Sequence, residues 1–145
     1  MTADMAITGK NYTGVPAQYT ISDRKAIHAF NGDGIGAGGT HTNSANGTMF
    51  MSSAFCNSGT PYSYPIYLQV DLGEVKAIDR VKFYNFNMVS GSKSYTVRGV
   101  KDFELYTSTA TAWKTSVAEI TNSYAKVLSG ALDSASGSNE EAGQV

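Results

Sequence analysis

The residues best suited to chemistry lie in the short segment Ala29-Phe-Asn-Gly-Asp33. Asn31 and Asp33 carry side-chain oxygens at alternate positions, and Gly32 between them allows a tight turn. Oxygen donors spaced in this way can converge on a hard cation such as calcium, with backbone carbonyls completing the coordination shell. The same spacing is also common in an Asx-turn that holds no metal. The spacing alone leaves both interpretations open.

A glycine motif follows directly, because Gly34, Gly36 and Gly39 satisfy the G-x-G-x-x-G pattern of dinucleotide-binding loops. Such a site needs a strand before the glycines, a helix after them and an acidic residue about 20 positions later. The residues that follow, Thr40-His-Thr-Asn-Ser44, do not begin an amphipathic helix. We therefore interpret residues 29–46 as a long polar loop, and loops of this length are usually functional or mobile.

The sequence offers little support for catalysis. His28 and His41 have no cysteine or carboxylate at metal-ligand spacing, and the single cysteine, Cys56, excludes an internal disulfide. There is no G-x-S-x-G elbow, although a Ser-His-Asp triad is defined by geometry and stays open. The carboxylates that could pair for glycoside hydrolysis mostly fall on predicted solvent faces: Asp71, Glu74, Asp79, Asp102 and Glu104. We expect no enzymatic activity.

The composition narrows the class of partner. The chain has 145 residues, of which 41% are hydrophobic, and this predicts one folded domain. A formal net charge of -1 leaves no basic surplus for binding nucleic acid. No apolar run of about 18 residues is present, so no membrane span is predicted. The first residues, Met1–Ile7, lack the charged and apolar regions of a signal peptide, and we expect an extracellular surface or a virion as the location.

Three segments must position these groups, and each alternates apolar and polar residues as a half-buried strand does. They are Ile66–Leu72, Val81–Asn85 and Val100–Tyr106. In the first segment Leu68 and Val70 are expected to face a core and Gln69 to face water. Phe83 and Phe103 are the corresponding core residues of the other two segments. No helix of comparable length is visible, so the sequence predicts an all-β sandwich.

The remaining segments are predicted with less regular structure. Residues 87–94 are expected to form a loop, and 112–115 a weaker fourth strand. From Ser129 onward the composition is rich in Ser and Gly, which is typical of a loop or linker.

The order of these segments along the chain resembles a known family. The motifs are Ala29–Asp33, Thr48-Met-Phe-Met-Ser52, Tyr67–Gly73, Arg80–Asn85, Arg98–Ser108 and Trp113. As an ordered series they are similar to the discoidin, or coagulation factor 5/8 type C, domain, which overlaps with the family 32 carbohydrate-binding modules. The resemblance covers approximately Ala3 to Glu119.

This resemblance implies a jelly-roll β-sandwich of about eight strands, with a galactose-binding-like fold. It also implies a structural calcium, held by the side chains of Asn31 and Asp33, by Thr48, and by carbonyls near Ala29 or Phe30. The chain departs from the family pattern by placing Asn31 where the first acidic residue is usual, so one negative charge is lost.

The usual sugar contacts of the family do not transfer to this chain. Met51 stands where galactose-binding members often place a His, and Asn85-Phe-Asn87 stands where a Pro-Arg pair is usual. We therefore select candidate ligand contacts from loop placement and side-chain type, because aromatic stacking and a few hydrogen bonds suit a shallow site. They are His41, Asn43, Tyr62, Tyr64, Asn85, Asn87 and Arg98.

The family pattern continues with strands beyond the Trp113 region that this sequence does not show. We expect a discoidin-like domain over residues 1–128, lacking its C-terminal strands, and a loop or truncated end over 129–145. Another copy or another chain could complete the sandwich by β-augmentation. The expected function is a non-catalytic module that binds carbohydrate on a cell or polymer surface. The alternative is a structural or adhesion module of a phage tail, virion or other surface assembly that makes mainly protein contacts.

Overall fold

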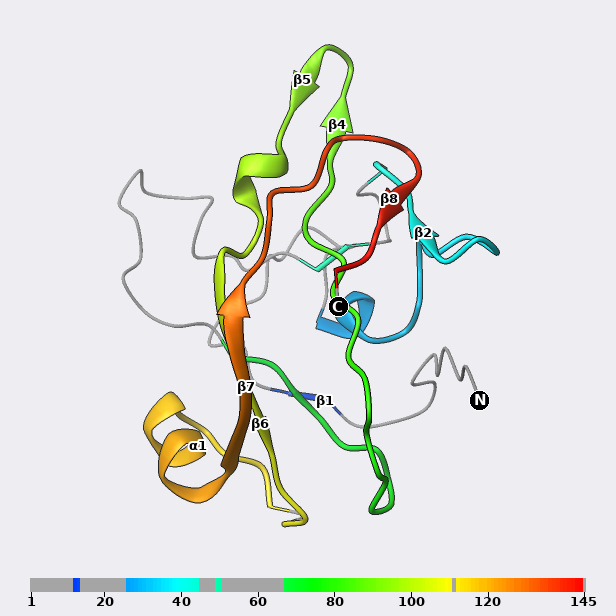
Figure 1. The fold of residues 1–145 in the computed structure, drawn as a ribbon. Coiled ribbons are helices and arrows are strands. Elements are labelled where there is room, and N and C mark those ends of the chain that lie inside the picture. Colours follow the sequence, from blue (N-terminus) through cyan, green and yellow to red (C-terminus); the bar gives the residue numbers. More distant parts are fainter. Residues whose placement is uncertain (1–11, 14–25, 45–48, 51–66, 111, 145) are drawn as a thin grey trace.

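The fold is built from short antiparallel strand pairs. In the computed structural model, the described residues are 12–13, 26–44, 49–50, 67–110 and 112–144 (Figure 1). Among them the strands are β1 Tyr12–Thr13, β2 Thr40–His41, β3 Gln69–Val70, β4 Val89–Ser90, β5 Lys93–Ser94, β6 Asp102–Thr107, β7 Ala125–Ala131 and β8 Glu141–Ala142. The helices are the 3-10 turns η1 Ala26–Ala29 and η3 Thr96–Arg98 and the α-helix α1 Val117–Ser123. The prediction of a mainly β protein is confirmed at this level.

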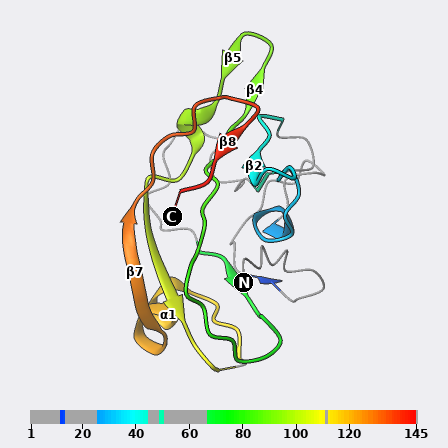
Figure 2. The same cartoon turned by 45° about the vertical axis from the view of Figure 1, so that its right-hand side comes forward.

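The strands pair as four separate two-stranded antiparallel sheets: β1 with β3, β2 with β8, β4 with β5, and β6 with β7. The longest is the β6–β7 ribbon, in which Phe103 lies opposite Gly130 and Leu105 opposite Leu128. A register shift between Leu105 and Tyr106 marks an irregularity in this ribbon. The β4–β5 hairpin lies at one end of the molecule, and α1 lies at the other end beside the ribbon (Figures 1 and 2).

The three predicted strands are found with different lengths. The prediction for 100–106 is confirmed by β6, whereas β3 occupies only Gln69–Val70 of the segment 66–72. In the segment 81–85 only Phe83 makes a ladder contact, an isolated bridge to Gln144 with N···O distances of 2.8 Å in both directions.

The solvent-facing assignment of Gln69 is wrong, because this side chain is buried. Both ends of its amide are bonded to backbone: Nε2 donates to the carbonyl of Lys114 at 2.7 Å, and Oε1 accepts from the Lys114 backbone N–H at 3.1 Å. A polar side chain can be buried at low cost when both ends of its amide are bonded to backbone. The alternation of apolar and polar residues therefore gave a wrong prediction for Gln69, because its hydrogen bonds, and not its hydrophobicity, determine its burial.

The predictions for the loops need correction as well. Residues 87–94, expected as a loop, form the β4–β5 hairpin, whose turn contains Gly91 at φ +58°. Residues 112–115 form no strand, and the helix α1 follows them. The segment from residue 129 onward, expected as loop, contains the end of β7 and the whole of β8. The Ser- and Gly-rich composition was misleading because these strands are short or exposed and need no apolar alternation.

Buried apolar residues are few in the part of the chain that is described: Met49, Ile120 and Ala135. The rings of Phe83 and Phe103 pack together with centroids 4.5 Å apart, which brings two of the predicted core residues into contact. No helix within the described ranges has the length and apolar character needed to cross a membrane.

Candidate functional site

The glycine-rich loop folds into a small hairpin. Ile35 bridges His41, and Gly36 donates its N–H to the carbonyl of Thr40 at 2.9 Å. The Thr42 N–H donates to the carbonyl of Gly34 at 2.9 Å, which closes the base of the hairpin. Its tip turns at Gly39, where φ is +68°, a conformation that glycine adopts without strain. The many glycines thus serve a tight reversal of the chain.

Two side chains of the segment 81–85 bind the tip of this hairpin. Tyr84 donates its hydroxyl to the carbonyl of Gly39 at 2.7 Å, and Lys82 Nζ donates to the same oxygen at 3.1 Å. The Lys82 ammonium also lies 5.1 Å from the centre of the Tyr84 ring, within the range of a cation–π contact. These contacts therefore fix the tip of the hairpin against the segment 81–85.

A turn near the C-terminus forms the second wall. Asn139 Oδ1 accepts from the Thr42 hydroxyl at 2.8 Å and from the Asn43 backbone N–H at 3.3 Å. Asn43 Nδ2 in turn donates to the carbonyl of Gly137 at 2.9 Å. Pairing of β2 with β8 continues this contact, with His41 opposite Glu141. The two walls, distant in sequence, are thereby joined along one edge.

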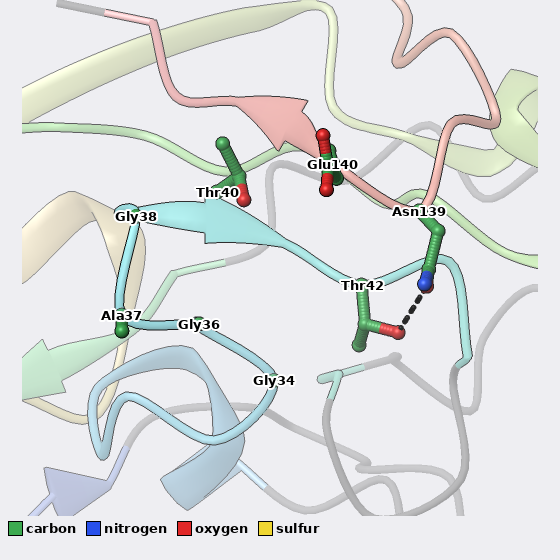
Figure 3. Close-up of a pocket in the computed structure, with 8 residues that line it drawn as sticks. All are labelled: Gly34, Gly36, Ala37, Gly38, Thr40, Thr42, Asn139 and Glu140. Carbon is green, nitrogen blue, oxygen red and sulfur yellow. Dashed lines mark hydrogen bonds between the residues drawn. The ribbon is translucent and has the colours of Figure 1, made fainter.

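Between these walls lies a shallow open pocket of about 470 Å³ (Figure 3). It is lined by Gly34, Gly36, Ala37, Gly38, Thr40, Thr42, Asn139 and Glu140. Figure 3 shows the glycine-rich loop on one side, the Asn139–Glu140 turn on the other, Thr40 on β2 between them, and Thr42 just after that strand. Its volume lies within the range of small-molecule sites, which is about 300–1,000 Å³.

The lining groups are polar and of both hydrogen-bonding kinds. Thr40 offers a hydroxyl that can donate and accept, and Glu140 offers a carboxylate that accepts. The side-chain oxygen of Asn139 accepts from Thr42 and Asn43, and its amide nitrogen is a hydrogen-bond donor. Glu140 is the single ionisable residue among the eight that line the pocket. None of the described residues that line the pocket is aromatic.

Of the predicted contacts, His41 lies next to this pocket but faces away from it. Thr40, which precedes it on β2, and Thr42, which follows that strand, line the pocket, and the His41 ring lies 5.9 Å from that of Tyr84. His41 is 5% exposed, and its Nδ1 has no hydrogen-bond partner among the described residues. Because side chains alternate along a strand, the residues on either side of His41 are the ones that reach the pocket.

Asn85 and Asn87 are buried and bonded to backbone. Asn85 Nδ2 donates to the carbonyls of Val100 and Asp133, both at 2.8 Å. Asn87 is 0% exposed; its Nδ2 donates to the carbonyl of Ser138 at 2.7 Å, and its Oδ1 accepts from the Gly137 N–H at 2.9 Å. These amides hold distant segments together, and a ligand could reach them only by breaking those bonds.

The other predicted contacts are dispersed. Arg98 is exposed at the end of η3 and its guanidinium stacks on the ring of Tyr95 at 4.5 Å, away from the pocket lining. Asn43 is half-buried beside the pocket and is tied to the C-terminal turn. Tyr62 and Tyr64 lie outside the described residues.

The predicted calcium ligands Asn31 and Asp33 form the Asx-turn that their spacing also allowed. The Asp33 N–H donates to Asn31 Oδ1 at 3.0 Å, while Asn31 Nδ2 donates to Asp33 Oδ2 at 2.5 Å. His28 Nδ1 also donates to this carboxylate oxygen at 3.0 Å, and Asp33 is 47% exposed. The described ranges contain no group of three or more His, Cys, Asp or Glu placed to hold a metal.

The three side-chain oxygens of Asn31 and Asp33 and the carbonyls of Ala29 and Phe30 are thus the donors in view, since Thr48 lies outside the described residues. A calcium ion takes six to eight oxygens, so the donors in view would need others to join them. The calcium site stays a prediction.

Sequence reasoning missed the pocket residues Thr40, Thr42, Asn139 and Glu140. The glycine-rich loop did carry a signal, because its length indicated a functional segment. Asn139 and Glu140 carried none, since they lie in a stretch whose composition is typical of a linker. The pairing of β2 with β8, together with the hydrogen bonds of Asn139 and Asn43, brings the two segments together.

Comparisons of the chain with protein-family models, with characterised proteins and with solved structures found no match.

Proposed function

We propose that this chain is a non-catalytic binding module that holds a short carbohydrate in the pocket between the glycine-rich hairpin and the Asn139–Glu140 turn. The observation that carries the proposal is the mixture of hydroxyl, amide, carboxylate and glycine backbone around one open pocket of about 470 Å³. Sugar hydroxyls donate and accept at once, so they complement a lining that offers both kinds of group.

The architecture of the pocket favours binding over catalysis. Hydrolysis of a glycoside needs two carboxyl groups on opposite sides of the bond, and among the described lining residues Glu140 alone carries a carboxylate. Acid–base chemistry by His41 is disfavoured because its ring is buried on the other side of β2, against Tyr84. An open pocket also leaves reacting groups in water, which weakens electrostatic stabilisation of a transition state.

The proposal includes the finer fold expected from sequence, a jelly-roll sandwich of the discoidin type. Its support is the antiparallel pairing of all four described sheets, the contact of Phe83 with Phe103, and the sequence motifs that resemble that family. In this proposal the calcium expected near Asp33 has a structural role.

A glycan array followed by isothermal titration tests this function, each run with calcium and with chelator. Thr40→Val removes the hydroxyl that faces the pocket, and Glu140→Gln removes its charge. Each variant should weaken binding of a glycan that the array identifies by about tenfold. This is the effect of losing one good hydrogen bond, which for Glu140 is charge-assisted. Thr107→Val on β6 and Glu74→Gln, neither of which lines the pocket, are the matched controls.

Absence of binding to every glycan under both calcium conditions would overturn the proposal. Binding that survives both pocket substitutions unchanged would move the site elsewhere and equally contradict it.

A second candidate function is a structural module of a phage tail, virion or other surface assembly. The observation that favours it is the exposure of all seven residues of β7, which include Val127 and Leu128. Sedimentation of the purified chain over a range of concentrations, and its binding to the particle it belongs to, are the measurements. A chain that stays monomeric and binds no particle contradicts this function.

A further inference from the structure

Among the described residues the β6–β7 sheet contains these two strands alone, so the outer edge of the ribbon has no described partner strand. β7 lies at the margin of the molecule in Figure 2. All seven β7 residues are exposed, whereas Phe103, Leu105 and Tyr106 of β6 are half-buried. A two-stranded ribbon is marginally stable in water, and additional strands stabilise it.

The ribbon is anchored on the β6 side. The Phe103 ring packs on that of Phe83, and a methyl group at Gly130 would lie 3.3 Å from the Phe103 ring. The inner strand therefore contacts the body of the molecule, and β7 extends its backbone N–H and C=O groups outward. Such an edge can accept another strand without any rearrangement of the body.

The edge carries few of the features that usually prevent strand addition. Proteins block exposed edges with proline, charged side chains, β-bulges or a covering element; here the register shift opposite Leu105 and Tyr106 leaves Val127 without a partner on β6. The β7 sequence, Ala-Lys-Val-Leu-Ser-Gly-Ala, contains no proline and one charge. That charge, on Lys126, is bound to Glu104 within the ribbon at 3.0 Å. The edge is thus nearly neutral, and none of the described strands pairs with it.

We propose that a second copy of this chain pairs with β7 in antiparallel fashion about a two-fold axis at Leu128, which produces a four-stranded sheet in the order β6–β7–β7–β6. Leu128 is the midpoint of β7, so this register centres the pairing on the strand. It places Lys126 opposite Gly130 of the second copy and the two Leu128 side chains opposite each other. No like charges meet, and the two exposed leucines cover one another. The inference gives the second candidate function a specific partner and does not depend on the glycan pocket.

Sedimentation equilibrium over a wide concentration range tests the pairing in the full chain. A dimer with a dissociation constant on the order of 10–100 µM is expected, because one strand edge is a small interface. Leu128→Lys places two cations across the axis and should raise the dissociation constant about tenfold or more. Val75→Lys introduces the same charge at a site that is 79% exposed and outside the ribbon, and should change nothing.

Mixing two variants makes the test specific for the axis. Leu128→Lys and Leu128→Glu should each dimerise poorly alone and should form a heterodimer when mixed, because opposite charges then meet. This rescue also shows that both variants are folded. A wild-type chain that is monomeric at all concentrations overturns the proposal. A dimer that neither variant weakens also overturns it, but leaves a structural function through another surface standing.

Discussion

Asn85 joins two distant segments through one buried side chain. Its Nδ2 donates to carbonyls of Val100 and Asp133, and its Oδ1 accepts from the N–H groups of Val100 and Phe86 at 2.8 Å and 2.9 Å. With four bonds to backbone, this amide cannot shift without leaving buried polar groups unpaired. Gly99 lies directly against it, and a methyl group there would come within 2.4 Å of Asn85 Oδ1.

Gly99→Ala should therefore destabilise the protein. The added methyl group overlaps a side chain that is fixed by its hydrogen bonds, so either the methyl group or the amide must move. The expected loss is about 1–3 kcal/mol of the free energy of unfolding, the usual effect of overpacking a tight site. Denaturant unfolding followed by circular dichroism measures it.

Gly38→Ala is the matched control, because no atom lies within 4 Å of the position that its methyl group would occupy. That substitution should be neutral or stabilising, since alanine restricts the unfolded chain. Equal losses from both substitutions would show that Asn85 is not fixed as described.

The sequence shows that these residues are polar, but it does not predict whether they lie inside the molecule or at a ligand site. Asn85 and Asn87 were selected as polar groups of a loop, and they are instead the most buried amides of the described chain. Nothing in the sequence distinguishes an asparagine that bonds backbone inside the molecule from one that faces a ligand. His41 shows the same limit, since its place on β2 decides that Thr40 and Thr42 reach the pocket.

The helix α1 illustrates an element that a local signal could have revealed. Ser116 is its N-cap and accepts a hydrogen bond from the Glu119 N–H at 3.2 Å. The Glu119 carboxylate accepts from the N–H of Thr115 at 2.7 Å and from its hydroxyl at 3.0 Å. The spacing Ser-x-x-Glu is the sequence signature of such a helix start. Ile120 is the buried residue of this short helix.

The hydrogen bonds at this helix start make its contribution to stability depend on pH. The backbone N–H of Thr115, followed by the Thr115 hydroxyl, lowers the pKa of Glu119 from its ordinary value. Since the folded pKa lies below the unfolded one, the stabilisation is present above the unfolded pKa and is lost as pH falls through the folded pKa. Glu119→Gln should therefore be less stable than wild type at neutral pH, and the difference should shrink in acid.

Thermal melts of both proteins between neutral pH and pH 3 give this difference directly. A gap in melting temperature that stays constant across the whole range would contradict the role of the Glu119 charge. An NMR titration of the Glu119 carboxyl locates the pKa independently of unfolding.

Periodicity predicted β6 because its alternation, with Phe103 and Leu105 inward, matches its half-buried face. It failed for β7 and β8, because one is exposed on every residue and the other is too short to alternate. Both strands are determined by pairing with a partner strand, and this tertiary pairing cannot be read from the local sequence. The prediction of a loop after residue 129 failed for this reason.

The C-terminal segment joins the parts of the molecule that lie far apart in sequence. It supplies β8 to β2, and Gln144 bridges Phe83. It also provides the groups that satisfy two buried amides: the carbonyl of Asp133 for Asn85, and Gly137 with Ser138 for Asn87. One wall of the proposed binding pocket belongs to the same segment. The whole fold and the candidate site therefore depend on residues whose composition resembles a linker.

Deleting residues 132–145 should accordingly abolish the cooperative fold, not merely shorten the chain. The deletion removes the partner of β2 and leaves the amides of Asn85 and Asn87 without several of their acceptors and donors, and each buried polar group left unpaired costs about 1–3 kcal/mol. Those losses together are comparable with the total stability of a small domain, about 5–15 kcal/mol. Thermal unfolding by calorimetry and amide dispersion in NMR spectra are the measurements, with deletion of Val145 alone as the control. A truncated chain that melts cooperatively at the wild-type temperature would contradict this prediction. It would show that the rest of the chain folds without the contacts of β8 and the C-terminal turn.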